Sequence, residues 1–236
     1  MCIRDRYNLL VKGGLIIDPS QDLHAHKDIA LAEGKVAALE DCIPEESAEQ
    51  VLDADGKIVT PGIIDIHVHV YPGVSHYGVD PDSSCLMKGA TTVVDAGSAG
   101  ADTFQGFHRY VIENSATRIY AFLNISASGM IDPVVGELTD IRYADVDRAI
   151  SICEKNKDLI RGVKVRLSKS IVGENGLEAL KRASKVSEAV GIPMMIHVGE
   201  TGIPISNILA EMKTNDILTH CFHARGESIL DKDGVI

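Results

Sequence analysis

The chain has 236 residues, of which 45% are hydrophobic and 24% charged, and its formal net charge is −11. This composition excludes a disordered or fibrous chain. An acidic chain without a basic block is unsuited to the phosphate backbone of nucleic acid, and no apolar run reaches the ~20 residues of a membrane span. The five cysteines are scattered and form no CxxC pair, which predicts reduced thiols in a cytoplasmic protein.

The first 60 residues are predicted to form a small β layer or half-sandwich. Polar turn residues separate their short apolar runs, and no long helical period interrupts them. The opening residues 1–6 are polar, and we interpret them as an unrelated lead-in. The apolar runs lie at residues 8–11, 14–17, 28–31, 35–39 and 57–59.

One segment of this region, His24-Ala25-His26, has the spacing of a metal-binding histidine pair. Its neighbours Asp22, Lys27 and Asp28 are polar. We therefore interpret the segment as a solvated loop without a metal. Spacing alone is weak evidence for a metal site, and the strand context of each pair has to decide.

The pattern of apolar residues changes after residue 60, where short apolar strands alternate with segments that have the period of a helix. This alternation predicts parallel βα units. The predicted strands are 63–69, 91–95, 119–124, 163–167, 194–197 and 217–220. The predicted helices are 81–88, 103–114, 143–157, 176–190 and 204–213.

Six βα units could form a doubly wound sheet or part of a (β/α)8 barrel. The doubly wound dinucleotide-binding fold needs a glycine-rich fingerprint after its first strand, but here the first strand ends in histidines. The later segment Gly97-Ser98-Ala99-Gly100 is a weak candidate for a phosphate-binding loop, and we interpret it as a plain tight turn. We therefore predict an incomplete (β/α)8 barrel of the TIM type.

The strongest chemical signal is the strand segment Asp65-Ile66-His67-Val68-His69. Side chains alternate across a strand, so His67 and His69 share one face. Two imidazoles at this spacing on an inward face can bind one metal ion, whereas the plainer interpretation is a pair of core histidines. Because paired core histidines are uncommon at the polar end of a strand, we favour metal binding.

Two further histidines close later strands, His197 after Met194-Met195-Ile196 and His220 after Ile217-Leu218-Thr219. Each alone would be interpreted as an ordinary buried histidine. Groups at the carboxyl ends of several parallel strands are, however, what a barrel active site requires. Together with the first pair, both become predicted metal ligands.

Lys164 and Arg166 alternate with Val163, Val165 and Leu167 on one predicted strand, so both basic side chains point towards the barrel axis;. An inward ammonium is costly to desolvate and shifts towards the neutral amine. A neutral amine can react with CO2 to give a carbamate, which can bridge two cations. The alternative is a lysine paired with a carboxylate or reaching the rim. The histidines make us favour the carbamate.

From residue 7 onward the chain resembles the amidohydrolase superfamily. The segment from Pro61 to His69 is similar to the first barrel strand of that superfamily, and Lys164, His197 and His220 follow in the order of its binuclear-zinc branch. The nearest group is the dihydroorotase-like amidohydrolase/deacetylase family. The resemblance implies a partial metal-dependent hydrolase barrel with six βα units in residues 61–236. Residues 1–60 would form the N-terminal part of a small β-sandwich domain.

Site roles also follow from the resemblance. His67 and His69 would bind the more buried of two zinc ions, and His197 and His220 the more exposed one, with carboxylated Lys164 as the bridge. Manganese, cobalt or nickel would suit the same donors. The implied reaction is hydrolysis of a C–N bond, in an N-acyl, N-acetyl or cyclic amide, by metal-activated hydroxide. The expected partner is a small-molecule substrate, and a homo-oligomer is left open.

The sequence departs from the family in two ways. The family's acid/base aspartate closes an eighth strand, whereas residues 61–236 supply six strands of a barrel that typically has about 250 residues. We therefore expect a C-terminally truncated and inactive fragment, with Asp95 a poor substitute base that we interpret as structural. Dihydroorotases of this pattern also carry a substrate-binding arginine where this chain has Tyr71. This difference weakens the interpretation of the chain as a dihydroorotase. Arg166 could hold an anionic or acyl group of the substrate, or form a structural ion pair.

Two alternatives remain beside the amidohydrolase. A nucleobase-type deaminase would use the same fold, but mononuclear deaminases usually lack the bridging lysine. A non-catalytic scaffold would keep the fold without turnover, which the intact set of ligand types argues against.

Overall fold

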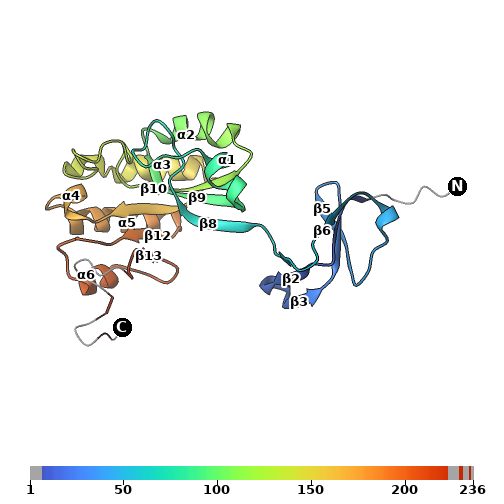
Figure 1. Cartoon of the computed structure of the whole chain (residues 1–236). Coiled ribbons are helices and arrows are strands. Elements are labelled where there is room, and N and C mark those ends of the chain that lie inside the picture. Colours follow the sequence, from blue (N-terminus) through green and yellow to red (C-terminus); the bar gives the residue numbers. More distant parts are fainter. Residues whose placement is uncertain (1–6, 223–228, 231–233, 235–236) are drawn as a thin grey trace. The chain divides into compact units, whose positions relative to one another are not determined.

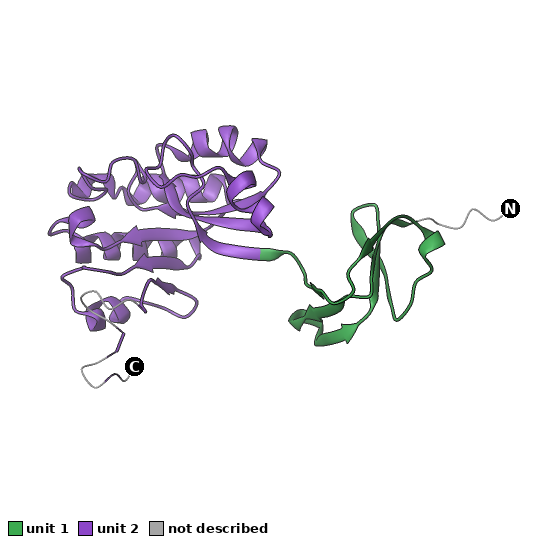
Figure 2. Cartoon of the chain, viewed as in Figure 1, with its two compact units in different colours: residues 1–63 green, residues 64–236 purple. Residues whose placement is uncertain are grey.

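The computed structural model describes residues 7–222, 229–230 and 234. The predicted lead-in, residues 1–6, lies outside the described residues. The chain divides into two compact units, Met1–Ile63 and Ile64–Ile236 (Figure 2). Over the described residues, no helix is long and apolar enough to cross a membrane.

The first unit consists of two small sheets. Leu10, Ala30, Ile43 and Ala48 form its buried apolar core. Strands β1 (Tyr7–Lys12), β4 (Asp28–Ala32), β5 (Lys35–Glu40) and β6 (Ala48–Asp53) form a four-stranded sheet in the order β5-β4-β1-β6. Strands β2 (Leu15–Asp18), β3 (Leu23–His26) and β7 (Ile58–Val59) form a three-stranded sheet in the order β3-β2-β7. Short 3-10 turns cover Pro19–Gln21 (η1) and Glu45–Ser47 (η2).

The prediction of a loop at His24-Ala25-His26 was wrong, because these residues lie in strand β3. Antiparallel pairing with β2 opposes His24 to Ile17 and His26 to Leu15. A polar segment becomes a strand here because cross-strand pairing, not its own hydrophobicity, organises it. Both histidines remain exposed, so the pair is a solvent-facing feature of β3.

The second unit is built on a parallel six-stranded sheet that curls into a half-barrel (Figure 1). Its spatial order, β13-β12-β11-β10-β9-β8, follows the chain, as expected when each strand pairs with the next βα unit;. The carboxyl ends of all six strands therefore meet at one edge of the sheet. The strands are β8 (Ile63–Val68), β9 (Ala90–Gly100), β10 (Arg118–Asn124), β11 (Ile160–Arg166), β12 (Met194–His197) and β13 (Ile217–Thr219).

Helices separate successive strands of this sheet. Helix α5 begins at Gly176 and ends at Val190, where Gly191 takes the left-handed conformation that closes many helices;. It packs on β11 and β12, and α2 packs on β9. The helices are α1 (Pro81–Ser84), α2 (Phe104–Tyr110), α3 (Val146–Lys155), α4 (Lys169–Val172), α5 and α6 (Ile205–Ala210), with 3-10 turns η3 (Leu86–Lys88), η4 (Ile112–Asn114) and η5 (Ile141–Tyr143).

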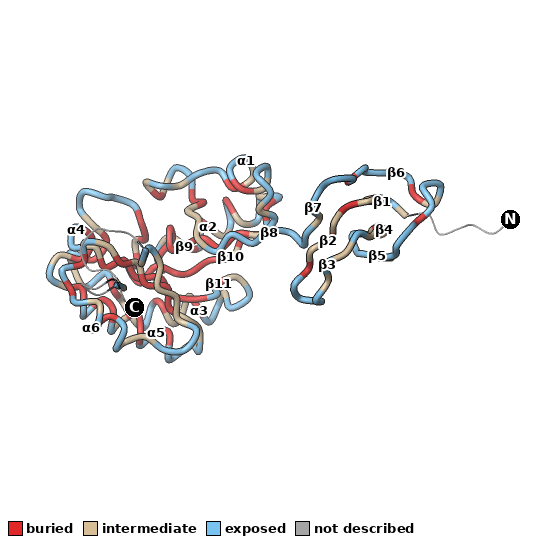
Figure 3. Tube along the Cα trace, turned by 60° about the horizontal axis from the view of Figure 1, so that its bottom comes forward, coloured by how far each residue is buried: buried red, intermediate tan, exposed pale blue. Residues whose placement is uncertain are grey.

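The main core lies between this sheet and its helices, and Figure 3 shows the strands β9, β10 and β11 largely buried. The side chains of Val163 and Val165 on β11, and of Leu167 directly after this strand, belong to this core. Strand β8 differs, because it is an edge strand and its Ile64 and Ile66 are 60% and 50% exposed. The alternation of apolar residues along β8 therefore does not by itself produce burial.

Candidate metal centre

Strand β8 delivers the first two histidines to the carboxyl edge of the sheet. His67 lies within β8 and His69 follows its last residue, so a strand-like spacing of two keeps both imidazoles on one side;. Their ring centroids are 5.6 Å apart. The structure therefore brings the HxH pair together as the sequence predicts.

The other two histidines reach the same cluster from the far edge of the sheet. His197 ends β12 and pairs in register with Thr219 of β13, which directly precedes His220. The His220 ring lies 4.7 Å from both the His67 ring and the His197 ring, centroid to centroid. His220 has a left-handed backbone with φ 66°, a strained conformation that is typical of functional sites.

Lys164 lies on β11 between these histidine-bearing strands. Its side chain is fully buried, and its Nζ atom has no hydrogen-bond partner among the described residues. Burial, together with the nearby charge of Arg166, lowers the pKa of this amine to about 7. A substantial fraction of the amine is therefore neutral near pH 7, as the predicted carbamate chemistry requires.

Three histidines of the cluster, His67, His69 and His197, are neutral bases. Burial lowers the pKa of His67 to about 4, of His69 to about 3 and of His197 to about 2. The charge of Lys164 also lowers the pKa of all three histidines. For His197, the charge of Arg166 lowers the pKa more than that of Lys164 does. Near neutral pH each of these rings thus carries a lone pair that an electron-pair acceptor can use.

Hydroxyl groups contact three of these imidazoles. Thr219 Oγ1 lies 2.8 Å from His67 Nδ1, and Ser98 Oγ lies 3.0 Å from His69 Nδ1. Ser168 Oγ lies 3.2 Å from His197 Nε2. Such contacts orient an imidazole ring and leave its other nitrogen available to a metal ion.

Asp95, at the second strand of the sheet, is a structural carboxylate and not a base directed at the cluster. Its oxygens accept the backbone N–H groups of Val70, Gly97 and Ser98 at 2.6–3.1 Å. Burial raises the pKa of Asp95, and these hydrogen bonds oppose that shift. The carboxylate thereby fixes the end of strand β9, which carries Ser98 towards His69.

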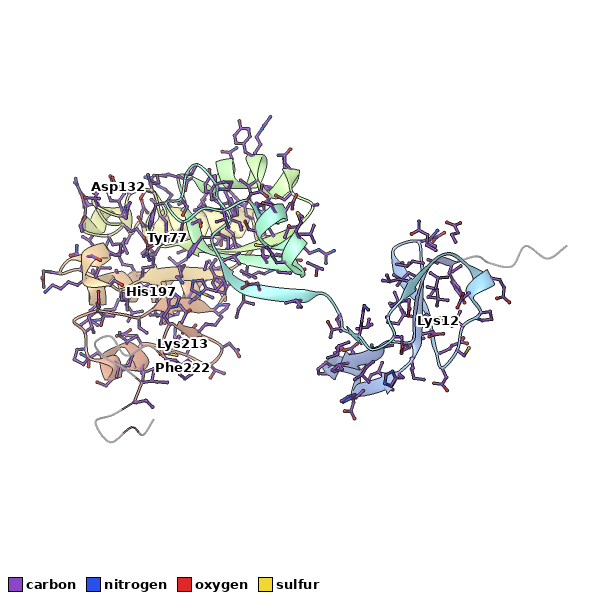
Figure 4. The ribbon with its side chains drawn as sticks, viewed as in Figure 1. Lys12, Tyr77, Asp132, His197, Lys213 and Phe222 are labelled. Atoms are coloured by element: carbon purple, nitrogen blue, oxygen red, sulfur yellow. The ribbon has the colours of Figure 1, made fainter. Side chains whose placement is uncertain are left out.

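Arg166 forms a buried ion pair with Glu137, which the sequence did not single out. Glu137 is 2% exposed and lies in the polar segment between β10 and α3, where no local pattern marks it. Its second carboxylate oxygen accepts a hydrogen bond of 2.9 Å from Asn124 Nδ2. The guanidinium also lies 5.9 Å from the centre of the Tyr77 ring. Figure 4 labels Tyr77 and His197, both in the second unit.

Tyr71 takes no part in this cluster. It is 7% exposed, its ring packs 4.9 Å from that of Phe107, and its hydroxyl donates to the Thr103 carbonyl at 3.3 Å. The position at which dihydroorotases of this pattern are expected to carry an arginine is therefore part of the core that faces α2.

The donors suit divalent metal ions even though no ready-made cage is present. Among the described residues, no three His, Cys, Asp and Glu side chains are arranged to hold one ion. The imidazoles instead adjoin in pairs, and the Lys164 amine, unpartnered among the described residues, lies within electrostatic range of three of them. Paired imidazoles with an anionic oxygen bridge are a donor set that zinc accepts.

A curled parallel sheet with a cluster of neutral imidazoles at the carboxyl ends of its strands defines a protein of the βα-barrel class. The chain belongs to the amidohydrolase family, whose sequence model matches residues 58–235.

The chain is 37% identical to the deacetylase Atu3266 of Agrobacterium fabrum, in a match that covers 85% of this chain and 50% of the relative. It is 35% identical to a deacetylase of Brucella anthropi, covering 92% and 53%. A solved dihydroorotase superposes with a TM-score of 0.86 at 34% identity, covering 93% of this chain and 59% of that one. An adenine deaminase gives a TM-score of 0.85 at 31% identity, covering 96% and 60%. The chain thus spans about half the length of the curated relatives that it matches.

Proposed function

We propose that the protein is a binuclear zinc-dependent amidohydrolase that hydrolyses the C–N bond of an N-acyl or cyclic amide, with an N-acetyl compound as the first choice of substrate. The observation that carries the proposal is the Lys164 amine, which is buried, has no hydrogen-bond partner among the described residues, and lies within electrostatic range of His67, His69 and His197. An unsatisfied buried amine is costly. Conversion to a carbamate would give it two oxygens that cations can neutralise.

In this proposal His67 and His69 hold the more buried ion, His197 and His220 hold the more exposed one, and carboxylated Lys164 bridges them. Divalent ions at this site would supply Lewis acidity towards the scissile carbonyl and lower the pKa of the attacking water. The chain's own contribution is to keep the imidazoles neutral, to orient them through hydroxyl contacts and to bury the bridging lysine.

Arg166 is the proposed anchor for an anionic or acyl group of a small-molecule substrate. Its charge reaches His67, His69 and His197 strongly enough to lower their pKa values, so it lies within electrostatic range of the reaction site. The ion pair with Glu137 would hold the guanidinium in one orientation. The same ion pair also fits the structural alternative, and substrate kinetics of Arg166 variants separate the two.

The assignment of this protein as a deacetylase has more support than its assignment to another activity of the family. Two curated deacetylases exceed 34% identity over most of this chain, and the buried Tyr71 leaves no arginine at the position expected in dihydroorotases. A mononuclear deaminase would give Lys164 no ligand role. The unpartnered lysine therefore favours the binuclear hydrolase.

Two measurements test this proposal. Elemental analysis of freshly purified protein is expected to find about two zinc ions per chain, and a metal-free preparation would contradict it. An exchange chimera, in which this chain replaces the matching half of the Agrobacterium deacetylase, is expected to release acetate from an acetylated substrate of the parent enzyme. The same chimera with Lys164→Met is the matched control and should be inactive.

A further inference from the structure

A row of buried polar side chains connects Arg166 to strand β10. Asn124, the last residue of β10, is fully buried, Glu137 is 2% exposed and Arg166 is 7% exposed. Arg166 Nη1 donates to Glu137 Oε1, and Asn124 Nδ2 donates to Glu137 Oε2 at 2.9 Å. Asn124 therefore contacts the carboxylate that pairs with the guanidinium, through the carboxylate oxygen that the guanidinium does not use.

The partners of Asn124 allow its amide group only one orientation. Its Nδ2 atom donates to the Gly97 carbonyl at 3.0 Å as well as to Glu137, and a carbonyl or carboxylate oxygen can only accept;. Its Oδ1 atom accepts the backbone N–H of Ser126 at 2.9 Å. Both N–H groups of the amide are thus committed, one to the backbone of β9 and one to Glu137, so the amide holds the carboxylate in one place.

The guanidinium of Arg166 keeps most of its hydrogen-bonding capacity. It carries five N–H donors, and among the described residues its side chain makes one hydrogen bond, to Glu137. The contact with the Tyr77 ring, 5.9 Å from the guanidinium carbon to the ring centre, uses no N–H group. Oxygen atoms of a bound molecule can accept from the remaining N–H groups in the paired geometry that a guanidinium offers, provided that the guanidinium keeps its orientation.

We propose that Asn124 is a positioning residue for Arg166: it holds the Glu137 carboxylate, and the carboxylate holds the guanidinium with its remaining N–H groups free for the substrate. The inference rests on the role of Arg166 as substrate anchor in the proposed function. It adds a residue of β10 whose own side-chain hydrogen bonds all go to other groups of the chain. A hydrogen bond to a charged group is worth about 10–100-fold in an equilibrium constant.

The test interchanges the amide and the carboxylate. Asn124→Asp places a second carboxylate opposite Glu137, and like charges at a buried site repel each other. Glu137→Gln removes the charge that pairs with Arg166. The double variant again has an amide donor facing a carboxylate, and it leaves the amide oxygen of residue 137 for Arg166. Asn156→Asp is the matched control, because Asn156 Nδ2 also donates a hydrogen bond of 2.9 Å, to the Ile152 carbonyl on helix α3.

The first readout is the rate at which phenylglyoxal modifies Arg166 in the metal-free chain, followed by peptide mass mapping. A guanidinium held by a buried carboxylate reacts slowly with this reagent. We expect each single variant to raise the rate about 10–100-fold, the double variant to recover most of that change, and Asn156→Asp to leave the rate unchanged. An unchanged rate in Asn124→Asp, or no recovery in the double variant, would overturn the proposal. Asn124→Ser removes the donor without adding a charge and replaces Asn124→Asp if that variant does not fold.

The second readout is steady-state kinetics of the exchange chimera, with whichever it cleaves of N-acetylalanine and the acetylated substrate of the parent enzyme. Each single variant should raise KM about 10–100-fold and lower kcat by less, because Arg166 binds the substrate and takes no part in bond cleavage. The double variant should recover KM, and a loss confined to kcat would overturn the proposal. A chimera that releases acetate from neither compound contradicts the proposed function instead, and the phenylglyoxal rates still decide the role of Asn124.

Discussion

The side chain of Lys164 lies directly against the backbone of Gly97, in the part of strand β9 that follows Asp95. A Cβ atom placed on Gly97 would come within 2.6 Å of Lys164 Cγ and 2.7 Å of its Cβ. Gly97 also has φ 92°, a conformation that L side chains rarely adopt;. The prediction of a plain tight turn at Gly97-Ser98-Ala99-Gly100 was wrong, because parallel pairing with β10 continues strand β9 as far as Gly100. Within that strand, the absence of a Cβ atom on Gly97 leaves room for the buried lysine.

Gly97→Ala is expected to displace Lys164 and to reduce bound zinc, in addition to a loss of stability of about 1–3 kcal/mol from overpacking. Gly89→Ala is the matched control, because Gly89 has a similar φ of 101° but nothing within 4 Å of its added Cβ. Zinc content and thermal unfolding of both variants check the prediction. Equal zinc loss in both would show that backbone strain, and not contact with Lys164, is responsible.

Lys164→Ala is expected to remove most of the bound metal, because it deletes the proposed bridging ligand while every histidine remains. Lys169→Ala changes an exposed lysine of helix α4 and should leave the metal content unchanged. Elemental analysis of the two purified variants is the measurement. If Lys164→Ala keeps the metal content of the parent protein, Lys164 has a structural role only.

Glu137→Gln is expected to lower the free energy of unfolding by about 3–5 kcal/mol, because it leaves the buried charge of Arg166 without its partner;. Adding Arg166→Met to Glu137→Gln should recover part of this loss. The exposed pair of Lys169 and Glu174 is the control, and Glu174→Gln should cost at most about 1 kcal/mol;. Denaturant unfolding measures all three, and a Glu137→Gln cost as small as the control would contradict the prediction.

The cysteines are expected to differ sharply in reactivity. Burial raises the pKa of the Cys153 thiol to about 12, whereas Cys42 is exposed. Iodoacetamide at pH 8 should therefore modify Cys42 and leave Cys153 intact until the protein unfolds. Peptide mass mapping with and without denaturant checks this, and rapid modification of native Cys153 would contradict the burial.

The raised pKa of the Cys153 thiol also predicts that the free energy of unfolding depends on pH in the alkaline range. The unfolded chain loses the Cys153 proton near the ordinary pKa of 9.0, while the folded chain keeps it until about 12. The free energy of unfolding should therefore fall as the pH rises from about 9 to 12. Cys153→Ala removes this dependence, and unfolding curves at pH 8 and pH 10.5 are the measurement. An equal slope in both proteins would contradict the assignment to Cys153.

Much of the second unit could be predicted because its signals are local. The helix expected at 176–190 is observed as Gly176–Val190, since an amphipathic period and a closing Gly191 mark it. The helix expected at 143–157 shrinks to Val146–Lys155, because Asp145 caps the chain three residues later than the pattern suggests;. Strand β6 (Ala48–Asp53) was missed, because its residues are mostly exposed and parallel pairing with β1 holds them.

By itself the sequence determined which residues can carry chemistry: His67, His69, Lys164, His197 and His220 are set by residue type and strand position. The tertiary structure alone decided their partners. Ser98, Ser168 and Glu137 act through contacts between segments 29 residues apart in the chain. No local period encodes such contacts, because they arise only when parallel strands bring their carboxyl ends to one edge of the sheet. Local propensity fixes the strands, but burial and hydrogen bonding at that edge set the charge and orientation of each side chain.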